Sequence, residues 1–130
     1  MVTIDTAGPA RNRAEVLVVD DEPAVLHSLE QFLRREGYSV LTAESGEYAL
    51  EIIRGSNIDL VLMDIKMPGM DGITTLREMK RINPMLKTII VTADGSPDKM
   101  VEAFNSGAYD YMVKPIDLLS LRQLVFSRLR

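Results

Sequence analysis

Five short apolar runs alternate along the chain with segments in which apolar residues recur at helical spacing. A continuous apolar run bounded by turn residues is typical of a strand buried on both faces, and the three-to-four-residue spacing predicts amphipathic helices. The predicted strands are 15–19, 38–43, 60–63, 88–92 and 109–113. The predicted helices, each following one strand, are 22–37, 45–55, 72–82, 96–107 and 117–130.

The regular alternation of strand and helix predicts an α/β fold. Parallel neighbours need crossover connections, so the pattern favours a doubly wound, five-stranded parallel sheet with helices on both of its faces. The run 38–43 alternates more than the others and is expected at an edge of the sheet. We expect one domain over residues 14–130, preceded by a disordered leader or expression remnant over residues 1–13.

Composition narrows the function classes. With 46% hydrophobic and 26% charged residues, the chain has an ordinary globular composition. No dense Lys/Arg cluster accompanies the net charge of -4, so no direct nucleic-acid contact is expected. The absence of cysteine and the single histidine exclude thiolate and multi-histidine metal sites. No apolar run approaches the roughly 20 residues of a membrane span, and no signal peptide is visible, so a cytoplasmic location is expected.

Polar side chains follow four of the predicted strands. Asp20 and Asp21 follow the first, Asp64 the third, and Thr92 and Lys114 end the last two. In a doubly wound sheet, ligands bind outside the carboxyl ends of the strands. Carboxylates suit Mg²⁺, a lysine and a hydroxyl suit phosphoryl oxygens, and an aspartate can itself accept phosphate. The sequence therefore predicts a magnesium and phosphoryl site at this edge.

Electrostatics explain why such a site needs cations. Carboxylates a few ångströms apart repel one another, and a phosphoryl group adds further negative charge. At an effective dielectric constant of ~20, one like-charge pair ~4 Å apart costs about 4 kcal/mol. A divalent cation together with Lys114 would reverse the sign of this interaction.

Four separate motifs resemble the receiver domain of two-component response regulators. They are Val18–Pro23, Met63–Gly72, Val91–Ala93 and Tyr111–Pro115, in the order found in that family. The resemblance covers residues 15–130. It implies a CheY-like, flavodoxin-like three-layer sandwich with strand order 2-1-3-4-5.

The resemblance implies that Asp64 is the phosphoacceptor. The donor would be the phosphohistidine of a sensor histidine kinase or histidine phosphotransfer protein, or a small phosphodonor. Asp20, Asp21 and Asp64, with the backbone carbonyl of Lys66, would hold Mg²⁺, with Mn²⁺ as a substitute. Such a domain catalyses only its own phosphorylation and dephosphorylation, and is not an enzyme acting on an external metabolite.

The resemblance also implies a switch. Thr92 and Ala93 would bind the phosphoryl group, Lys114 would pair with it, and Tyr111 would turn inward when Thr92 moves. The peptide bond before Pro115 is expected to be cis. The signal would pass to an output domain or effector through the fourth helix, fifth strand and last helix, the α4-β5-α5 face of the family. A homodimer is possible, and the oligomeric state is left open.

Four residues beside the predicted site residues have roles other than phosphoryl transfer or metal binding by their side chains. Lys66 and Asp94 each lie two positions beyond a predicted site residue, and could pair across the mouth of the site and slow phosphate loss. Asp71 is expected to cap the helix that begins at Gly72, rather than to bind metal. His27, beside the apolar stripe of the first helix, is expected at the surface.

Three alternatives stay open at this point. An aspartate-nucleophile phosphatase of the haloacid-dehalogenase type would need an acid two positions after its nucleophile, where this chain has Lys66. A flavin or nucleotide binder would need a phosphate-cradling loop after the first strand, where Asp20, Asp21 and Glu22 repel phosphate. The third alternative is a degenerate receiver that only binds partners.

The sequence leaves the wider context open. The last predicted helix reaches Arg130 without a terminator, which favours excision from a longer protein. Ile116 stands where many relatives have phenylalanine, so the subfamily is not assigned. The kinase, the output, the oligomeric state and the phosphate lifetime are not predicted.

Overall fold

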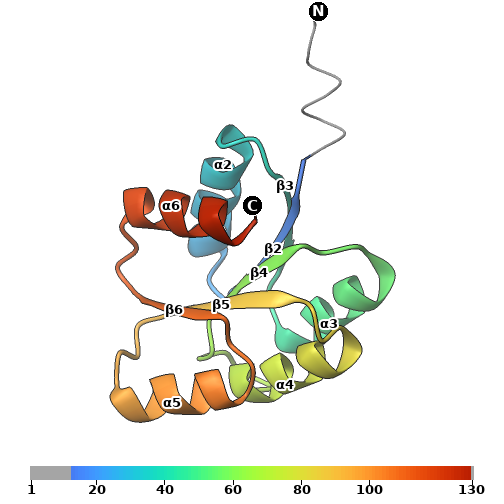
Figure 1. Cartoon of the computed structure of the whole chain (residues 1–130), viewed down its shortest axis with the longest axis vertical. Helices are drawn as coiled ribbons and strands as arrows, with labels where there is room; N and C mark the ends of the chain where they lie inside the picture. Colours follow the sequence, from blue (N-terminus) through green and yellow to red (C-terminus); the bar gives the residue numbers. More distant parts are fainter. Residues whose placement is uncertain (1–12, 130) are drawn as a thin grey trace, which may run out of the picture.

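Ten elements alternate strictly between strand and helix in this computed structural model, which describes residues 13–129 (Figure 1). The leader expected over residues 1–13 lies outside the described residues except for Arg13. The strands are β2 (Glu15–Val19), β3 (Ser39–Ala43), β4 (Leu60–Met63), β5 (Lys87–Thr92) and β6 (Asp110–Val113). The helices are α2 (Pro23–Arg35), α3 (Gly46–Gly55), α4 (Gly72–Ile82), α5 (Pro97–Asn105) and α6 (Leu118–Arg128).

All five strands form one parallel sheet in the order β3-β2-β4-β5-β6. Counted along the chain this is 2-1-3-4-5, so the predicted fold class and the predicted edge position of β3 are confirmed. The central strands pair in tight register, with Leu17 opposite Val61 and Met63 opposite Ile90. The strand order reverses beside β2, which places the carboxyl ends of β2 and β4 at the switch point.

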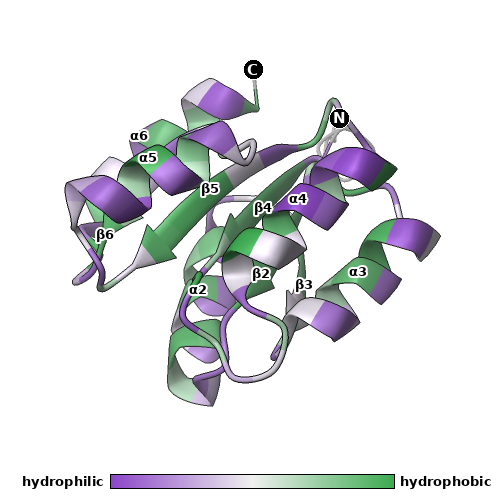
Figure 2. Ribbon diagram, turned by 90° about the horizontal axis from the view of Figure 1, so that it is seen from below, coloured by the Kyte–Doolittle hydropathy of each residue, from purple (hydrophilic) through white to green (hydrophobic). Residues whose placement is uncertain are grey.

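Helices cover both faces of the sheet and create two separate cores. Figure 1 shows α2 and α6 on one face and α3, α4 and α5 on the other. Because successive strand side chains point to opposite faces, Val16 and Val18 join the first core whereas Leu17 and Val19 join the second. In Figure 2, which views the sheet from below, the strands carry mostly the hydrophobic colour, whereas the helices carry both colours.

Short-range capping signals define the helix ends. The side chains of Ser45, Asp71, Ser96 and Asp117 accept hydrogen bonds from backbone N–H groups of α3, α4, α5 and α6, respectively. Gly37 follows α2 with a φ of 99°, a backbone conformation that favours glycine. Every predicted element is present, with bounds that differ from the prediction by at most two residues.

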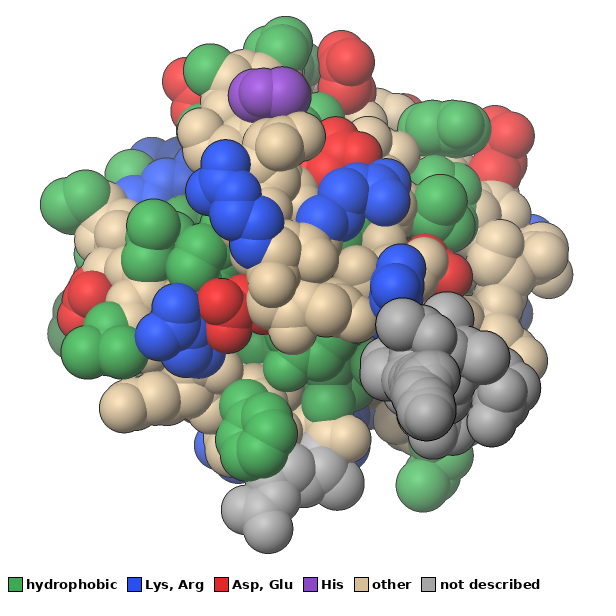
Figure 3. Space-filling view, turned by 90° about the horizontal axis from the view of Figure 1, so that it is seen from above, with side chains coloured by type: hydrophobic (Ala, Val, Ile, Leu, Met, Phe, Trp, Pro, Cys, Tyr) green, Lys and Arg blue, Asp and Glu red, His purple; other side chains and the backbone are tan. Residues whose placement is uncertain are grey.

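On the α2–α6 layer, hydrophobic, basic and acidic side chains are interspersed at the surface (Figure 3). Arg122 of α6 donates from Nε and Nη2 to the two carboxylate oxygens of Glu36 beside α2, at 2.9 and 3.1 Å. The same guanidinium lies over the ring of Phe32.

Within residues 13–129, no helix is both long and apolar enough to cross a bilayer.

Candidate functional site

The carboxyl ends of four strands deliver the predicted side chains to one edge of the sheet. The backbone ladder continues one residue past β2, β4 and β6: Asp20 N–H donates to Ala43 O at 3.1 Å, Asp64 N–H to Val19 O at 3.0 Å, and Lys114 N–H to Thr92 O at 2.8 Å. These bonds fix where each side chain leaves the sheet. The apolar runs therefore determine the placement of the polar groups that follow them.

Lys114 joins two buried carboxylates. Its Nζ lies 2.8 Å from Asp20 Oδ2 and 2.9 Å from Asp64 Oδ2, and it donates to both. Asp20 and Asp64 are only 3% and 7% exposed, and 18% of the Lys114 side chain is accessible. Glu22 approaches the same ammonium group more loosely, at 3.9 Å.

The electrostatics of this cluster favour a charged lysine. Burial alone would lower the pKa of Lys114, but the hydrogen bonds and negative charges of Asp20 and Asp64 outweigh it and raise the pKa above its usual value. One ammonium faces two carboxylates, so the buried cluster is short of positive charge if both are ionised. Such a site attracts a further cation.

Local turns orient the second oxygen of each carboxylate. Asp20 Oδ1 accepts the N–H of Glu22 at 3.0 Å, and Asp64 Oδ1 accepts the N–H of Lys66 at 2.9 Å. Both contacts span two residues, as in Asx turns. Each carboxylate is held at both oxygens and still has free lone pairs for a metal or an incoming group.

The predicted metal ligands are brought to one edge but do not converge on a common point. Asp21 is half-buried, and its side chain makes no ion pair or hydrogen bond within residues 13–129. In the same part of the chain, no three His, Cys, Asp or Glu side chains are arranged around a single ion position. Asp20 and Asp64 converge on Lys114 instead. The donor set is of the hard oxygen type that Mg²⁺ prefers, so the chemistry fits the ion.

Thr92 and Tyr111 are connected through the backbone of Asp94. Thr92 is fully buried, and its Oγ1 accepts the N–H of Asp94 at 3.4 Å. The Tyr111 hydroxyl donates to the carbonyl oxygen of Asp94, and its ring packs against the second core and beside Phe104. Burial, followed by the charges of Asp94 and Asp64, raises the pKa of Tyr111. Ala93, between Thr92 and Asp94, is exposed.

Lys66 and Asp94 face each other across the mouth of the site. Lys66 Nζ lies 3.9 Å from Asp94 Oδ2. Asp94 Oδ1 accepts the N–H of Ser96 at 3.0 Å. The hydrogen bonds from Ser96, and then the charges of Lys66 and Lys99, lower the pKa of Asp94. The pair is present as an exposed contact, and its effect on phosphate loss stays a prediction.

The remaining predicted positions have structural contacts. Asp71 Oδ1 accepts the N–H groups of Ile73 and Thr74 at 2.8 and 3.2 Å, as a helix cap does. A Cβ added to Gly72 would lie 2.2 Å from Ile65 Cα, so no larger residue fits there. The Lys114–Pro115 peptide bond is cis, as the resemblance implies. His27 is exposed on α2.

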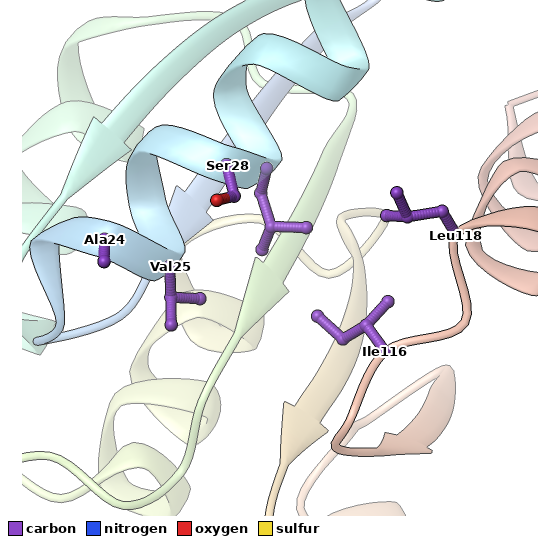
Figure 4. Close-up of a pocket in the computed structure, with 6 residues that line it drawn as sticks. Ala24, Val25, Ser28, Ile116 and Leu118 are labelled. Atoms are coloured by element: carbon purple, nitrogen blue, oxygen red, sulfur yellow. The ribbon is translucent and has the colours of Figure 1, made fainter.

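Two features beside the site had no signal in the sequence pattern. Glu47 of α3 accepts the N–H of Met70 at 3.3 Å, across 23 positions of sequence. An apolar pocket of about 370 Å³ lies between α2 and the segment that joins β6 to α6. Figure 4 shows Val25 of α2 and Ile116 pointing into it from opposite sides.

Comparison with known proteins decides the family. The model of the response regulator receiver domain matches residues 16–126 of the chain. The chain belongs to this family. The receiver domain is 45% identical over 108 residues, or 83% of the chain, to the transcriptional regulatory protein ZraR of Escherichia coli K12. It is 42% identical over 106 residues, or 82% of the chain, to the DNA-binding transcriptional regulator NtrC of the same strain. The matches span 24% and 23% of those proteins, so the chain covers about a quarter of their length.

Solved receiver structures have the same fold. A CheY-like receiver domain protein from Methanospirillum hungatei superposes with a TM-score of 0.87 at 34% identity, covering 90% of this chain and 94% of its own. The response regulator TrrA of Thermotoga maritima, solved in complex with Mg²⁺-BeF, gives a TM-score of 0.82 at 35% identity and covers 89% and 99%. The chain is thus the receiver domain of a two-component response regulator, with the CheY-like fold that the resemblance implied.

Proposed function

We propose that Asp64 accepts a phosphoryl group from the phosphohistidine of a sensor histidine kinase or histidine phosphotransfer protein. The observation that supports this role is the convergence of Asp64 and Asp20 on Lys114 at the buried strand-end edge. In the reaction, an Asp64 carboxylate oxygen forms a bond to phosphorus. The P–N bond breaks, and its electron pair returns to the imidazole of the donor.

Residues around Asp64 would stabilise the transferred group. Lys114 already donates to Asp64 Oδ2 and can follow the negative charge onto the phosphoryl oxygens. The Thr92 hydroxyl and the Ala93 N–H lie at the end of β5, at the same edge of the sheet, and would donate to those oxygens. The site thus offers one fixed cation, one hydroxyl and one backbone N–H to a group that brings almost two negative charges.

Mg²⁺ is the proposed cofactor, with Mn²⁺ as a substitute of similar oxygen-ligand preference. Asp20, Asp21 and Asp64, with the carbonyl of Lys66, would hold the ion, which supplies the positive charge that the carboxylate cluster lacks. The TrrA relative was solved with Mg²⁺-BeF at a TM-score of 0.82, which supports this assignment.

Phosphorylation would be transmitted through Asp94. Thr92 Oγ1 accepts the Asp94 N–H, and the Tyr111 hydroxyl donates to the Asp94 carbonyl. If the Thr92 hydroxyl turns toward the phosphoryl group, it would give up its hydrogen bond from the Asp94 N–H. The backbone of Asp94 would then shift, and Tyr111 would follow through its hydrogen bond to the Asp94 carbonyl. Moving such an equilibrium from 1:99 to 99:1 takes about 5.5 kcal/mol of differential binding.

The responding surface would be the face made by α5, β6 and α6, which is the face that the family calls α4-β5-α5. Large apolar side chains are exposed there, as expected of a surface that binds an output domain, an effector or a second copy. They are Val101, Phe104, Tyr109, Val113, Leu119 and Phe126. The NtrC relative is described as DNA-binding, and the match spans 23% of it. We therefore propose control of an output through this face, without nucleic-acid contact by the receiver itself.

A different surface is the candidate docking site for the protein that donates the phosphoryl group. The pocket between α2 and Ile116 adjoins the site in sequence on both sides, because α2 follows Asp20 and Asp21 and Ile116 follows Lys114 by two residues. Its lining is mainly apolar, and Leu118 also borders a neighbouring hollow that contains His27 and Arg35. We propose that the kinase or phosphotransfer protein docks here while its phosphohistidine reaches Asp64.

The test of the central proposal is phosphorylation by acetyl phosphate, followed by intact mass, with and without Mg²⁺. Wild type should gain one phosphoryl group only with the metal. Asp64→Asn should gain none, while Asp98→Asn, which changes an exposed acid on α5, should behave as wild type. Incorporation into Asp64→Asn, or incorporation by wild type without any divalent cation, would refute the assignment of the acceptor or of the cofactor.

A further inference from the structure

The loop that follows the phosphoacceptor, residues 64–71, is held firmly at both ends. At its start, Lys66 N–H donates to Asp64 Oδ1 at 2.9 Å. At its end, Gly72 N–H donates to Ile65 O at 3.1 Å and closes the loop on itself. The Met67 side chain is buried in the second core and anchors the first half of the loop.

The second half of this loop makes one hydrogen bond to another element, in addition to the packing of the partly buried Met70 side chain against the second core. Pro68 and Gly69 are exposed and Met70 is half-buried. Among the hydrogen bonds described for residues 13–129, only the bond from Met70 N–H to Glu47 Oε2, at 3.3 Å, ties positions 67–70 to the rest of the protein.

Both oxygens of Glu47 face this segment. A Cβ added to Gly69 would lie 3.4 Å from Glu47 Oε2 and 3.6 Å from Oε1, so the carboxylate lies directly against the Gly69 backbone. Gly69 has a φ of 82°, which glycine adopts without strain. Without the Glu47 contact, this glycine would let the loop sample other conformations.

Glu47 itself belongs to the capped and closely packed start of α3. It belongs to the first turn of α3, which Ser45 caps through the Tyr48 N–H. The helix start packs tightly on α4, because a Cβ added to Gly46 would lie 2.2 Å from Thr75 Oγ1. The carboxylate is thus presented from a fixed helix end to a loop with a glycine in its middle.

We infer that Glu47 is a positioning residue for the metal site, which acts by ordering the loop that carries the Lys66 carbonyl. This inference rests on the proposed function, in which that carbonyl is a Mg²⁺ ligand. A loop ordered in advance binds an ion more tightly, because less conformational entropy is lost on binding. Glu47 contacts neither the ion nor the phosphoryl group in this role.

The test compares Glu47→Ala with Glu47→Gln, which keeps an oxygen acceptor but removes the charge. Glu51→Gln is the matched control, because it removes an exposed charge from the same helix at a side chain with no hydrogen bond or ion pair within residues 13–129. Two quantities are measured: hydrogen exchange of the Met70 amide in metal-free protein, and the Mg²⁺ dissociation constant by calorimetry.

Glu47→Ala should exchange the Met70 amide faster and bind Mg²⁺ about two- to fivefold more weakly, the range expected for loss of one exposed hydrogen bond. Glu47→Gln should stay close to wild type in both measurements. If Glu47→Gln and Glu51→Gln weaken Mg²⁺ binding as much as Glu47→Ala does, the effect is that of net charge and the inference fails.

Failure of the proposed function would look different. If wild type does not bind Mg²⁺ at all, the metal assignment falls and this inference falls with it. If wild type binds Mg²⁺ and Glu47→Ala binds it equally well, only the inference is overturned. An unchanged Met70 exchange rate in Glu47→Ala would overturn it as well, whatever the metal does.

Discussion

The two loops that flank the site are built in contrasting ways. The loop of residues 64–71 is fixed mainly by close backbone packing of Gly72 on Ile65 and by the buried side chain of Met67, and its exposed second half is held by one hydrogen bond to Glu47. The loop of residues 93–96 has no buried side chain and depends on polar contacts, most of which involve Asp94. Packed contacts resist change, whereas hydrogen bonds exchange partners readily. The first loop is therefore suited to hold the proposed acceptor, Asp64, in place, and the second to respond if Asp64 is phosphorylated.

The largest expected effect comes from breaking the packed loop. Gly72→Ala should lower the free energy of unfolding by about 3 kcal/mol, because the new methyl group meets the backbone of Ile65 and no flexible side chain can move aside. Urea unfolding measures this change. Gly55→Ala is the control: a Cβ added at this position, the last residue of α3, would meet no other part of the protein within 4 Å, so the change should be neutral or slightly stabilising. Equal stabilities of the two variants would show that the first loop is not rigid.

Removal of the shared lysine should have the next largest effect. Lys114→Met leaves Asp20 and Asp64 facing each other without a cation, so we expect a loss of about 2 kcal/mol at pH 8, less than for a fully buried pair because the lysine is partly accessible. Urea unfolding again measures the loss. Lys99→Met, which breaks an exposed pair with Glu102, is the control and should lose less than about 1 kcal/mol.

The pH dependence of the same variant gives a second check. The pKa of Lys114 is raised on folding, so its contribution is fully present below its unfolded pKa of about 10.5 and is lost as pH rises through the folded value. The stability difference between wild type and Lys114→Met should therefore be constant over the mildly alkaline range up to that pH and shrink above it. A difference that keeps growing above that pH would contradict the assigned contact.

The hydroxyl of Tyr111 should matter to the second loop alone. Tyr111→Phe removes the hydrogen bond to the Asp94 carbonyl but keeps the ring packing, so we expect about 1 kcal/mol lower stability. Exchange of the amides of residues 94–96 should become faster, while the Met70 amide in the first loop stays protected. Tyr109→Phe, whose hydroxyl makes no hydrogen bond within residues 13–129, is the control. Equal loosening of both loops would remove the distinction between them.

The smallest effect is expected at the contact between the loops. Lys66→Ala removes the 3.9 Å pair but leaves the hydrogen bond from Ser96 to Asp94 in place, so it should change stability by less than about 1 kcal/mol. If the pair hinders water at the mouth, the phosphorylated variant should lose phosphate up to about fivefold faster, the rate equivalent of that energy. Loss at the wild-type rate, followed by intact mass, would end the idea that the pair protects the acyl phosphate.

Local signals explain why the elements and most of the site were predictable. An apolar run determines both a strand and the residue that follows it, so the sequence alone assigns Asp64 and Lys114 to one edge of the sheet. The sequence could not show which of two neighbouring acids faces the lysine. Asp20 is buried against Lys114 whereas Asp21 is half-exposed, because successive residues at a strand end point in different directions.

Contacts between distant elements could not be predicted from local patterns. Glu47 meets Met70 across 23 positions, and Tyr111 meets Asp94 across 17. Each contact depends on how a helix or strand lies against a loop, and this is set by packing of the whole core. Glu47 is exposed on α3, and the local sequence pattern carries no information about its partner.

The sharing of one lysine by two buried acids has a consequence for how the domain can evolve. Asp64→Asn removes a charge from a crowded site and leaves Lys114 and Asp20 as a balanced pair, so we expect a higher urea midpoint than wild type. If Asp64 is the acceptor, as proposed, selection for that role acts against stability at this position. A lineage released from that selection would gain a more stable domain by one substitution, and could keep its partner-binding surfaces after losing phosphotransfer.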